Sequence, residues 1–379
     1  MKPAHTVIST VGTSLYNNLK ALKPDDASPA RAALAAAFAV GDRDAIVEGL
    51  LALEPVDRTC GAEINSLASL IGKGYAVPDA NLIFCHSDTP QGHDVGAILA
   101  DYYLHRDHSR VLVEAIDDLQ DRDPRLFRTR GLRNLARIVC RAIREYDPSS
   151  CAINATGGYK AQIAIAVLMG QAIGVPVYYK HELFDEIIAF PPMPVALDFE
   201  AWMRLNGLLY SLEREPQPAD VLDEHPDDAE TLESLVDRTP IDGLDLVELS
   251  PTGQIFHETF RQRFRANREQ FLPPAVPASE KKTPHFEDAG TMRKIRGLEK
   301  FVQDLTDQVP QVARCATWYS NPDLPKPTRF WLGSDGIVGQ YSDGRATAKF
   351  RVETRARDRA QMASVVAVLG EWLEERVGR

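Results

Sequence analysis

The sequence predicts an α/β protein whose N-terminal part is built on a parallel sheet. Three observations lead to this prediction. Residues 151–179 read as strand, turn, helix and strand, the unit from which parallel sheets are made. The chain opens with another strand, residues 6–9, which also runs through a polar turn into a helix. Between these two segments, strand patterns at 81–85 and 111–115 alternate with helical ones.

The elements between the strands follow from apolar spacing and end signals. Ser28 is a helix N-cap residue, and Pro29 suits the first helical position. On this basis we expect helices at residues 30–40, 44–53, 64–70, 94–104 and 131–146. Residues 182–197 read as a closing strand pair, and prolines within that range mark the exit from the sheet.

The turn at residues 154–160, NATGGYK, has the composition of an anion-binding site. Gly157 and Gly158 allow the backbone to approach a phosphate, and the following helix offers unpaired N–H groups. Thr156 and Lys160 add a hydroxyl and a positive charge. The same spacing is equally compatible with a tight turn in which Lys160 points into water.

A second polar loop, residues 10–14, follows the first strand. Ligands of open parallel sheets bind beyond the carboxyl ends of the strands, where the winding order reverses. We therefore expect this loop, the turn at 154–160 and a third loop at 87–91 to converge on one ligand. The chain has no G-x-G-x-x-G after a strand and no G-x-x-x-x-G-K-[ST], which argues against NAD and ordinary nucleoside triphosphates.

The segments ISTVGTSL and NATGGYK resemble the two signature loops of CARF domains, the CRISPR-associated Rossmann-fold sensors. The resemblance covers roughly residues 1–190. It implies a homodimer that binds a cyclic oligoadenylate across its two-fold axis, most often cyclic tetra-adenylate; some members also cleave this ligand slowly. The ligand contacts that it implies are Thr10, Gly12, Thr13, Ser14, Asn154, Thr156, Gly157, Gly158 and Lys160.

Length and composition limit the alternatives. A chain of 379 residues has room for two or three domains, and 44% hydrophobic with 26% charged residues is typical of soluble globular proteins. The most apolar run, 163–179, is shorter than the roughly 20 residues that span a bilayer. The N-terminus shows no signal-peptide pattern, and the five cysteines are scattered. We therefore expect a cytoplasmic protein with no membrane contact, no metal and no cofactor.

Charge is distributed unevenly along the chain. The whole chain carries a formal net charge of −11, whereas residues 279–379 contain 17 basic and 14 acidic residues, a net charge of +3. A mildly basic tail on an acidic body fits a C-terminal domain that faces nucleic acid. Chance variation between domains would give the same asymmetry.

A smaller unit is expected over residues 198–278. Helical patterns occupy 202–212, 229–236 and 254–265, a strand lies at 247–249, and an acidic connector spans 213–228. In the last helix, phenylalanines at every fourth position predict a buried stripe, with arginines 261, 263, 265 and 268 on the other sides. The segment resembles the winged helix that often follows CARF domains. Its arginines bind RNA or an acidic protein, or form a solvated face.

The C-terminal part has the pattern of an α+β domain. We expect a helix at 291–306, strands at 312–318, 328–332, 337–341 and 346–354, and a final helix at 359–376. Alternation in the fourth strand and its continuation places Lys349, Arg351, Arg355 and Arg357 on one face. Such a face suits a phosphodiester groove, although soluble edge strands show the same alternation.

Two nuclease types are disfavoured. A HEPN ribonuclease needs Arg followed by His after four to six residues, and no histidine of the chain has that spacing. A metal-dependent nuclease of the D…E-x-K type has only Glu280-x-Lys282 to draw on, at the end of a linker without strand character.

The order of a helical start, a small antiparallel sheet and a closing helix resembles the RelE family of ribosome-dependent mRNA interferases. The similarity is confined to about residues 326–369. By this resemblance the catalytic basic residues fall on Arg329 and Arg357, within a group that includes Lys349, Arg351 and Arg355. Ala363 occupies the place of the family's tyrosine, so Tyr341 or Lys326 is the expected substitute.

Three parts are therefore predicted: a Rossmann-like CARF sensor over 1–197, a winged-helix connector with a linker over 198–278, and a RelE-like domain over 279–379. The expected activity is metal-independent mRNA cleavage in antiviral CRISPR defence, activated by cyclic tetra-adenylate. The expected partners are a second copy of the chain, mRNA and the ribosome, through its A site or stalk proteins. The alternatives are a DNA-binding transcription regulator and a CARF-linked metal-dependent nuclease.

Overall fold

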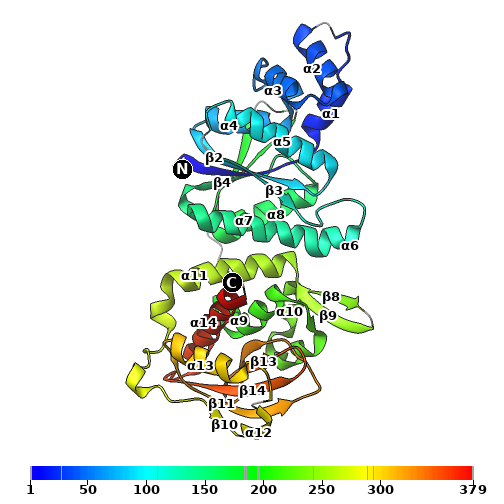
Figure 1. Ribbon diagram of the computed structural model, residues 1–379. Coiled ribbons are helices and arrows are strands. Elements are labelled where there is room, and N and C mark those ends of the chain that lie inside the picture. The colour runs from blue at the N-terminus through cyan, green and yellow to red at the C-terminus, as the bar shows by residue number, and fades with distance from the viewer. Residues whose placement is uncertain are drawn as a thin grey trace. The chain divides into compact units, whose positions relative to one another are not determined.

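The computed structural model folds into two compact units, Met1–Ala196 and Leu197–Arg379 (Figure 1). The division falls within a residue of the expected end of the sensor. The remaining two predicted parts belong to a single unit. The structure describes residues 2–26, 28–108, 110–182, 184, 186–193, 197–241, 243–287, 289–292 and 294–377.

Unit 1 is built on a six-stranded sheet in which the first five strands along the sheet are parallel and the last is antiparallel. The strands, in spatial order, are β3 (Val111–Ile116), β2 (Ala76–Ser87), β1 (Ala4–Thr10), β4 (Cys151–Asn154), β5 (Val177–Lys180) and β6 (Ile187–Phe190). The chain winds outward from β1 in one direction and from β4 in the other. The switch point therefore lies between β1 and β4, which pair directly with Ser9 opposite Asn154.

Helices cover both faces of this sheet. In Figure 1, α4 and α5 lie on one side and α7 and α8 on the other. All of the predicted helices are present: α1 (Ser14–Ala21), α2 (Pro29–Val40), α3 (Arg43–Leu51), α4 (Gly61–Gly72), α5 (Pro90–Leu104), α7 (Leu132–Tyr146) and α8 (Lys160–Ile173). Burial on both faces explains why β1 and β4 read as continuous apolar runs: Val7, Ile8 and Ile153 are all fully enclosed.

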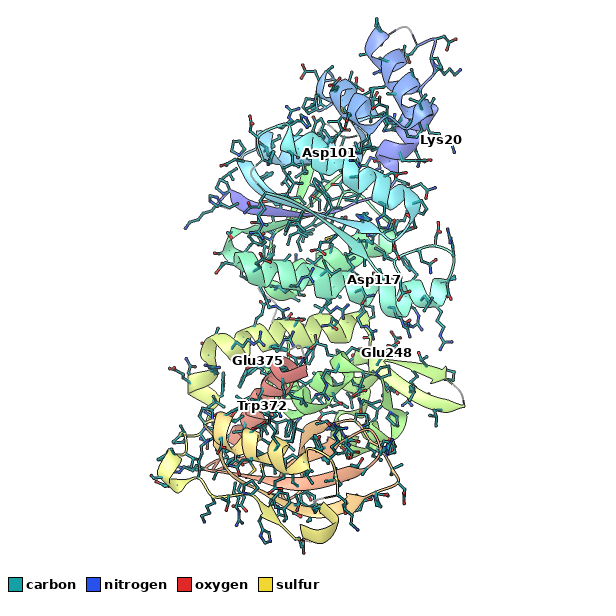
Figure 2. The ribbon with its side chains drawn as sticks, viewed as in Figure 1. Lys20, Asp101, Asp117, Glu248, Trp372 and Glu375 are labelled. Atoms are coloured by element: carbon teal, nitrogen blue, oxygen red, sulfur yellow. The ribbon has the colours of Figure 1, made fainter. Side chains whose placement is uncertain are left out.

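Helices α2 and α3 pack into the apolar core of unit 1 through Leu34, Val47 and Leu50. Asp101 of α5, labelled in Figure 2, also forms a 2.8 Å ion pair with Arg43 at the start of α3.

The strand pair expected at 182–197 is not formed by the described residues of that range, which contain only β6. This strand pairs with β5 instead. Residues 183, 185 and 194–196 lie outside the described residues.

The first part of unit 2 has the helices and the strand that the sequence predicts. Helices α9 (Phe199–Arg214), α10 (Ala229–Leu235) and α11 (Pro251–Phe271) surround a three-stranded sheet of β7 (Gln217–Pro218), β9 (Leu244–Leu249) and β8 (Val236–Ile241). Phe256, Phe260 and Phe264 are buried against α9, as the four-residue spacing predicts.

The second part of unit 2 is a five-stranded sheet with helices on one face. The strands in spatial order are β10 (His285–Phe286), β11 (Val312–Asn321), β14 (Thr347–Thr354), β13 (Gly336–Ser342) and β12 (Arg329–Gly333). Helices α13 (Leu298–Gln308) and α14 (Arg359–Val377) pack on the inner face through Phe301 and Val366. Trp372 of α14, labelled in Figure 2, donates its indole N–H to Gln308 of α13.

The helix predicted at 291–306 is divided in two. A short α12 (Ala289–Met292) precedes α13, and Gly297 lies between them with a φ of 82°, a left-handed conformation that stops a helix. Arg293 lies outside the described residues.

The two parts of unit 2 share packing contacts, which is why they form one unit. Helix α9 approaches β12 so closely that a Cβ on Gly207 would lie 2.4 Å from the carbonyl oxygen of Phe330. Beside it, Asn206 donates to the carbonyl of Ala363 in α14 over 3.1 Å.

None of the helices in the described ranges combines the length and apolar character of a bilayer span.

Candidate functional site

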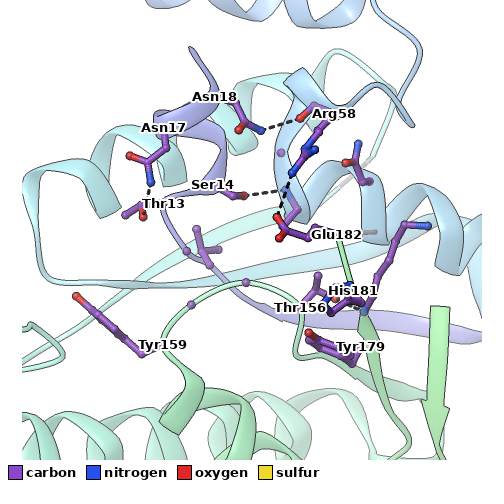
Figure 3. Close-up of a pocket in the computed structure, with 18 of the residues that line it drawn as sticks. Thr13, Ser14, Asn17, Asn18, Arg58, Thr156, Tyr159, Tyr179, His181 and Glu182 are labelled. Atoms are coloured by element: carbon purple, nitrogen blue, oxygen red, sulfur yellow. Dashed lines mark hydrogen bonds and ion pairs between the residues drawn. The ribbon is translucent and has the colours of Figure 1, made fainter. Parts of the chain in front are cut away.

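A polar pocket of about 520 Å³ opens at the carboxyl ends of the parallel strands of unit 1 (Figure 3). It lies at the switch point between β1 and β4, where two polar loops leave the sheet side by side. The loop after β1 contributes Gly12, Thr13 and Ser14, and the turn after β4 contributes Thr156, Gly157 and Gly158. Six of the nine predicted ligand contacts therefore line one pocket.

The two loops touch one another directly. Thr10 at the end of β1 is buried and donates its hydroxyl to the carbonyl of Gly157 over 2.6 Å. A Cβ on Gly12 would lie 2.5 Å from the amide nitrogen of Gly158. A Cβ on Gly157 would likewise lie 2.8 Å from the amide nitrogen of Gly12. Gly12 and Gly157 are thus required for close backbone contact, and the loops form one continuous surface.

Asn154 lies beneath the pocket. Its side chain is fully buried and donates to the hydroxyl of Ser66 over 2.8 Å. It also accepts from the hydroxyl of Thr156 over 2.7 Å, and that hydroxyl in turn accepts from the backbone N–H of Lys180 over 3.0 Å. Thr10 and Asn154 therefore shape the pocket from below and are not among the residues that line it.

Lys160 does not line the pocket either. It is the exposed first residue of α8, one position beyond Tyr159, which does line it. The basic residues of the lining are Arg58, Lys180 and His181, none of which the sequence pattern singles out. Figure 3 shows Tyr159 at one end of the pocket and Tyr179 at the other.

A buried acid supports the first loop. Glu63, in the first turn of α4, accepts from the backbone N–H of Gly12 over 2.7 Å and from the hydroxyl of Ser14 over 3.3 Å. Burial raises the pKa of this carboxyl group, although both hydrogen bonds act in the opposite direction. In sequence Glu63 looks like an ordinary helix-start acid, so nothing there signals its role.

The rim of the pocket carries an ion pair. Arg58 and Glu182 meet with 3.4 Å between Nη2 and Oε2, and both side chains are about 70% exposed (Figure 3). The backbone around Arg58 is well anchored: its carbonyl accepts from Asn18 over 2.7 Å, and Asn65 donates to the carbonyl of Asp57 over 2.9 Å. An exposed guanidinium on an anchored backbone can also form charge-assisted hydrogen bonds with an anion.

A second candidate surface is the face of the C-terminal sheet that points away from α13 and α14; we call it the outer face. Strand pairing arranges its side chains in two cross-strand rows. One row is Ala316, Arg351, Val338 and Trp331, and the next is Tyr319, Lys349, Gln340 and Arg329. Three of the seven predicted catalytic residues thus share one face.

Two of the predicted catalytic residues are paired with acids of one short helical turn, η4 (Ala219–Glu224). The Glu224 carboxylate accepts from both terminal nitrogens of Arg329, and Asp220 lies 3.8 Å from the Lys326 ammonium. The Arg329 guanidinium also lies 4.2 Å above the ring of Trp331, and the residue is only 5% exposed. Arg329 is therefore covered rather than open.

The remaining three predicted catalytic residues do not join Arg329, Lys349 and Arg351 on the outer face. Tyr341 follows Gln340 and so points to the inner face, where its ring packs on Phe301 and its hydroxyl donates to the carbonyl of Arg296. Burial raises its pKa, opposite to what a general base requires. Arg355 is paired with Glu280, and Arg357 lies exposed before α14.

Two of the arginines considered for RNA binding in the connector are instead engaged within unit 2. Arg261 is 5% exposed and forms ion pairs with Glu213, Glu258 and Glu374, and Arg265 pairs with Glu371 over 2.6 Å. Burial raises the pKa of Glu374 to about 8. Three acids around one arginine leave an excess of negative charge, and a proton on Glu374 relieves it.

The fold of unit 1 is Rossmann-like, because parallel strands wind outward in both directions from the β1–β4 switch point. Residues 58–193 match the model of a family described as CRISPR-associated protein (Cas_APE2256). The match covers well under half of the chain; it includes the turn at 154–160 and not the loop at 10–14. It supports a CRISPR-associated protein, as the CARF resemblance implies. No curated protein matches the chain in sequence.

Proposed function

We propose that this protein is a cyclic oligoadenylate sensor coupled to an mRNA endoribonuclease. The observation that carries the proposal is the convergence of the loop after β1 and the turn after β4 on one pocket. Two polar, glycine-containing loops, a helix N-terminus behind each and Arg58 at the rim offer donors and positive charge to phosphates. Cyclic tetra-adenylate is the proposed ligand, held between two copies of the chain.

The proposed cleavage site is the outer face of the C-terminal sheet. There the 2′-oxygen of a ribose attacks the adjacent phosphorus and the bond to the 5′-oxygen breaks, which leaves a 2′,3′-cyclic phosphate and a 5′-hydroxyl. Lys349, Arg351 and Arg329 stabilise the negative charge that develops on the phosphate oxygens. Neutral Lys326 is the proposed acceptor of the 2′-hydroxyl proton, since Tyr341 lies on the inner face, and a proton from water completes the 5′-hydroxyl of the leaving group. The ribosomal A site orients the message.

The two activities need a link, and η4 is our proposed link. As long as Glu224 holds Arg329, this guanidinium is unavailable to RNA, and Asp220, 3.8 Å from the Lys326 ammonium, competes with phosphate for that cation. Ligand binding shifts the connector and releases them. This requires the ligand to bind the released form more tightly, because a ligand with equal affinity for both forms shifts nothing.

The test is to incubate the full chain with translating ribosomes and cyclic adenylates of several ring sizes. Message cleavage that depends on one of these rings supports the proposal. A shift of duplex DNA without RNA cleavage would favour a transcription regulator, and Mg²⁺-dependent cleavage of naked nucleic acid would favour a metal-dependent nuclease. If no cyclic adenylate binds the wild-type protein, the sensor assignment fails.

A further inference from the structure

A β-bulge on β11 creates an unusual pair of exposed aromatic rings. Thr317 pairs with Phe350 and Tyr319 pairs with Lys349, so Trp318 is an extra residue in the ladder. In a regular strand, Trp318 and Tyr319 would point to opposite faces. At a bulge, two residues oppose one on the partner strand, and the side chains are re-aimed.

Both rings are on the outer face. Trp318 lines a groove of about 570 Å³ together with Trp331, Val338 and Arg351. The Tyr319 ring lies 5.8 Å from the Lys349 ammonium, which lies 5.4 Å from the ring of Trp331. Trp318 and Tyr319 are 42% and 41% exposed, whereas Trp331, below the cations, is 8% exposed.

Cations surround the two rings. Lys349 and Arg351 follow on the neighbouring strand, and Arg359 lines the same groove from the start of α14. The acids nearby are already matched in part, because Glu353 is paired with Arg314 over 2.6 Å and Glu224 with Arg329. Asp335, at the tip of the β12–β13 turn, is the remaining acid of the groove lining.

Interleaved aromatic rings and cations have the chemistry of a single-stranded nucleic acid surface. Unpaired bases stack on aromatic side chains, while the phosphates beside them contact Lys and Arg. A duplex does not offer this, since its bases are already stacked on one another. We infer that Trp318 and Tyr319 form a base-stacking platform that binds unpaired nucleotides of RNA beside the cationic face. That the RNA bound there is also the substrate for cleavage rests on the proposed nuclease function.

The platform makes a specific prediction about what the protein binds. The full chain should bind a short single-stranded oligoribonucleotide more tightly than an abasic one of equal length and charge, by about tenfold per stacked base. Stacking should also quench tryptophan fluorescence. Trp318→Ala should lower the preference for intact RNA by about tenfold and abolish the quenching. Trp318→Phe should keep the preference and lose the quenching, which separates stacking from a general loss of structure.

Two further variants complete the test. Arg351→Ala should weaken binding of intact and abasic RNA equally and lower the salt dependence by about one phosphate contact. Leu244→Ala, on the exposed β8–β9 hairpin, should change neither the RNA affinity nor the preference for intact over abasic RNA. Unchanged base preference in Trp318→Ala and Tyr319→Ala overturns the inference, as does an effect of Leu244→Ala alone, which would assign RNA to the hairpin. These measurements need neither ribosomes nor cyclic nucleotide, so their failure is distinguishable from failure of the proposed activity.

Discussion

Glu224 accepts hydrogen bonds from both terminal nitrogens of Arg329, over 2.7 and 3.0 Å, although 105 residues separate the two in sequence. Arg329 is a residue to which the RelE resemblance assigns catalysis, and here its guanidinium is occupied by a carboxylate of its own chain. A carboxylate that accepts from both terminal nitrogens leaves neither of them free for a phosphate. Under the proposed function, the position of η4 would therefore control whether Arg329 can contact RNA.

Glu224→Gln should raise the RNA cleavage that occurs without cyclic nucleotide by about tenfold. The amide keeps the size of the side chain but removes the charge, and a hydrogen bond between charged groups contributes about 1.5–3 kcal/mol. Cleavage of ribosome-bound message without ligand is the measurement. Asp223→Asn removes the same charge from the next position and should have no effect. If Glu224→Gln leaves cleavage in the absence of ligand unchanged, η4 does not restrain the site.

Arg58→Ala should weaken cyclic tetra-adenylate binding by about tenfold, because a charge-assisted contact to phosphate is lost. Glu182→Gln should act in the opposite direction and tighten binding, since it removes the acid that competes for Arg58. Calorimetric titration of the full chain measures both effects. Arg43→Ala breaks a less exposed ion pair away from the pocket and should leave affinity unchanged. Weaker binding in both Arg58→Ala and Glu182→Gln would mean that the pair is merely structural.

Gly157→Ala should destabilise unit 1 by about 1–3 kcal/mol and abolish ligand binding. The added methyl group would lie 2.1 Å from Oε1 of Glu63 and 2.7 Å from the carbonyl oxygen of Thr10, so the two loops must separate. Thermal denaturation and ligand titration check the two effects. Gly72→Ala, at the end of α4, meets no atom within 4 Å and should be neutral or slightly stabilising. Normal ligand affinity in Gly157→Ala would contradict the close-contact argument.

The stability of unit 2 should fall as the pH rises from about 5 to 8. Glu374 has a folded pKa of about 8 against an ordinary value of 4.5, so in this window the folded protein holds a proton that the unfolded chain has lost. Folding then takes up a proton and becomes less favourable at higher pH. Glu374→Gln should flatten this dependence, whereas Glu375→Gln, at the exposed neighbouring position, should retain it.

Urea denaturation followed by tryptophan fluorescence is the appropriate measurement. All four tryptophans, at 202, 318, 331 and 372, belong to unit 2, so their signal reports its unfolding and not that of unit 1. An identical pH dependence in wild type and Glu374→Gln would place the proton elsewhere in the cluster around Arg261.

Local patterns were sufficient for most of the fold. Apolar spacing predicted the helices. The strand–turn–helix–strand unit predicted a parallel sheet in unit 1, and its first five strands in spatial order are parallel. The turn at 154–160 was identified because glycines, a hydroxyl and a helix start lie within seven consecutive residues. The stripe at Phe256, Phe260 and Phe264 is buried as predicted. In each case the residues that predict the element are close to one another in the sequence.

What the sequence by itself determined is therefore the type and order of most elements and the two polar loops that line the pocket of unit 1. Only the tertiary structure decided which side chains meet: Glu63 with Gly12, Arg58 with Glu182 and Glu224 with Arg329, pairs separated by 51, 124 and 105 residues. It also decided that Lys160 stays outside the pocket and that Tyr341 lies on the inner face. Strand register, a bulge and close helix packing set these contacts, and they depend on residues distant in sequence.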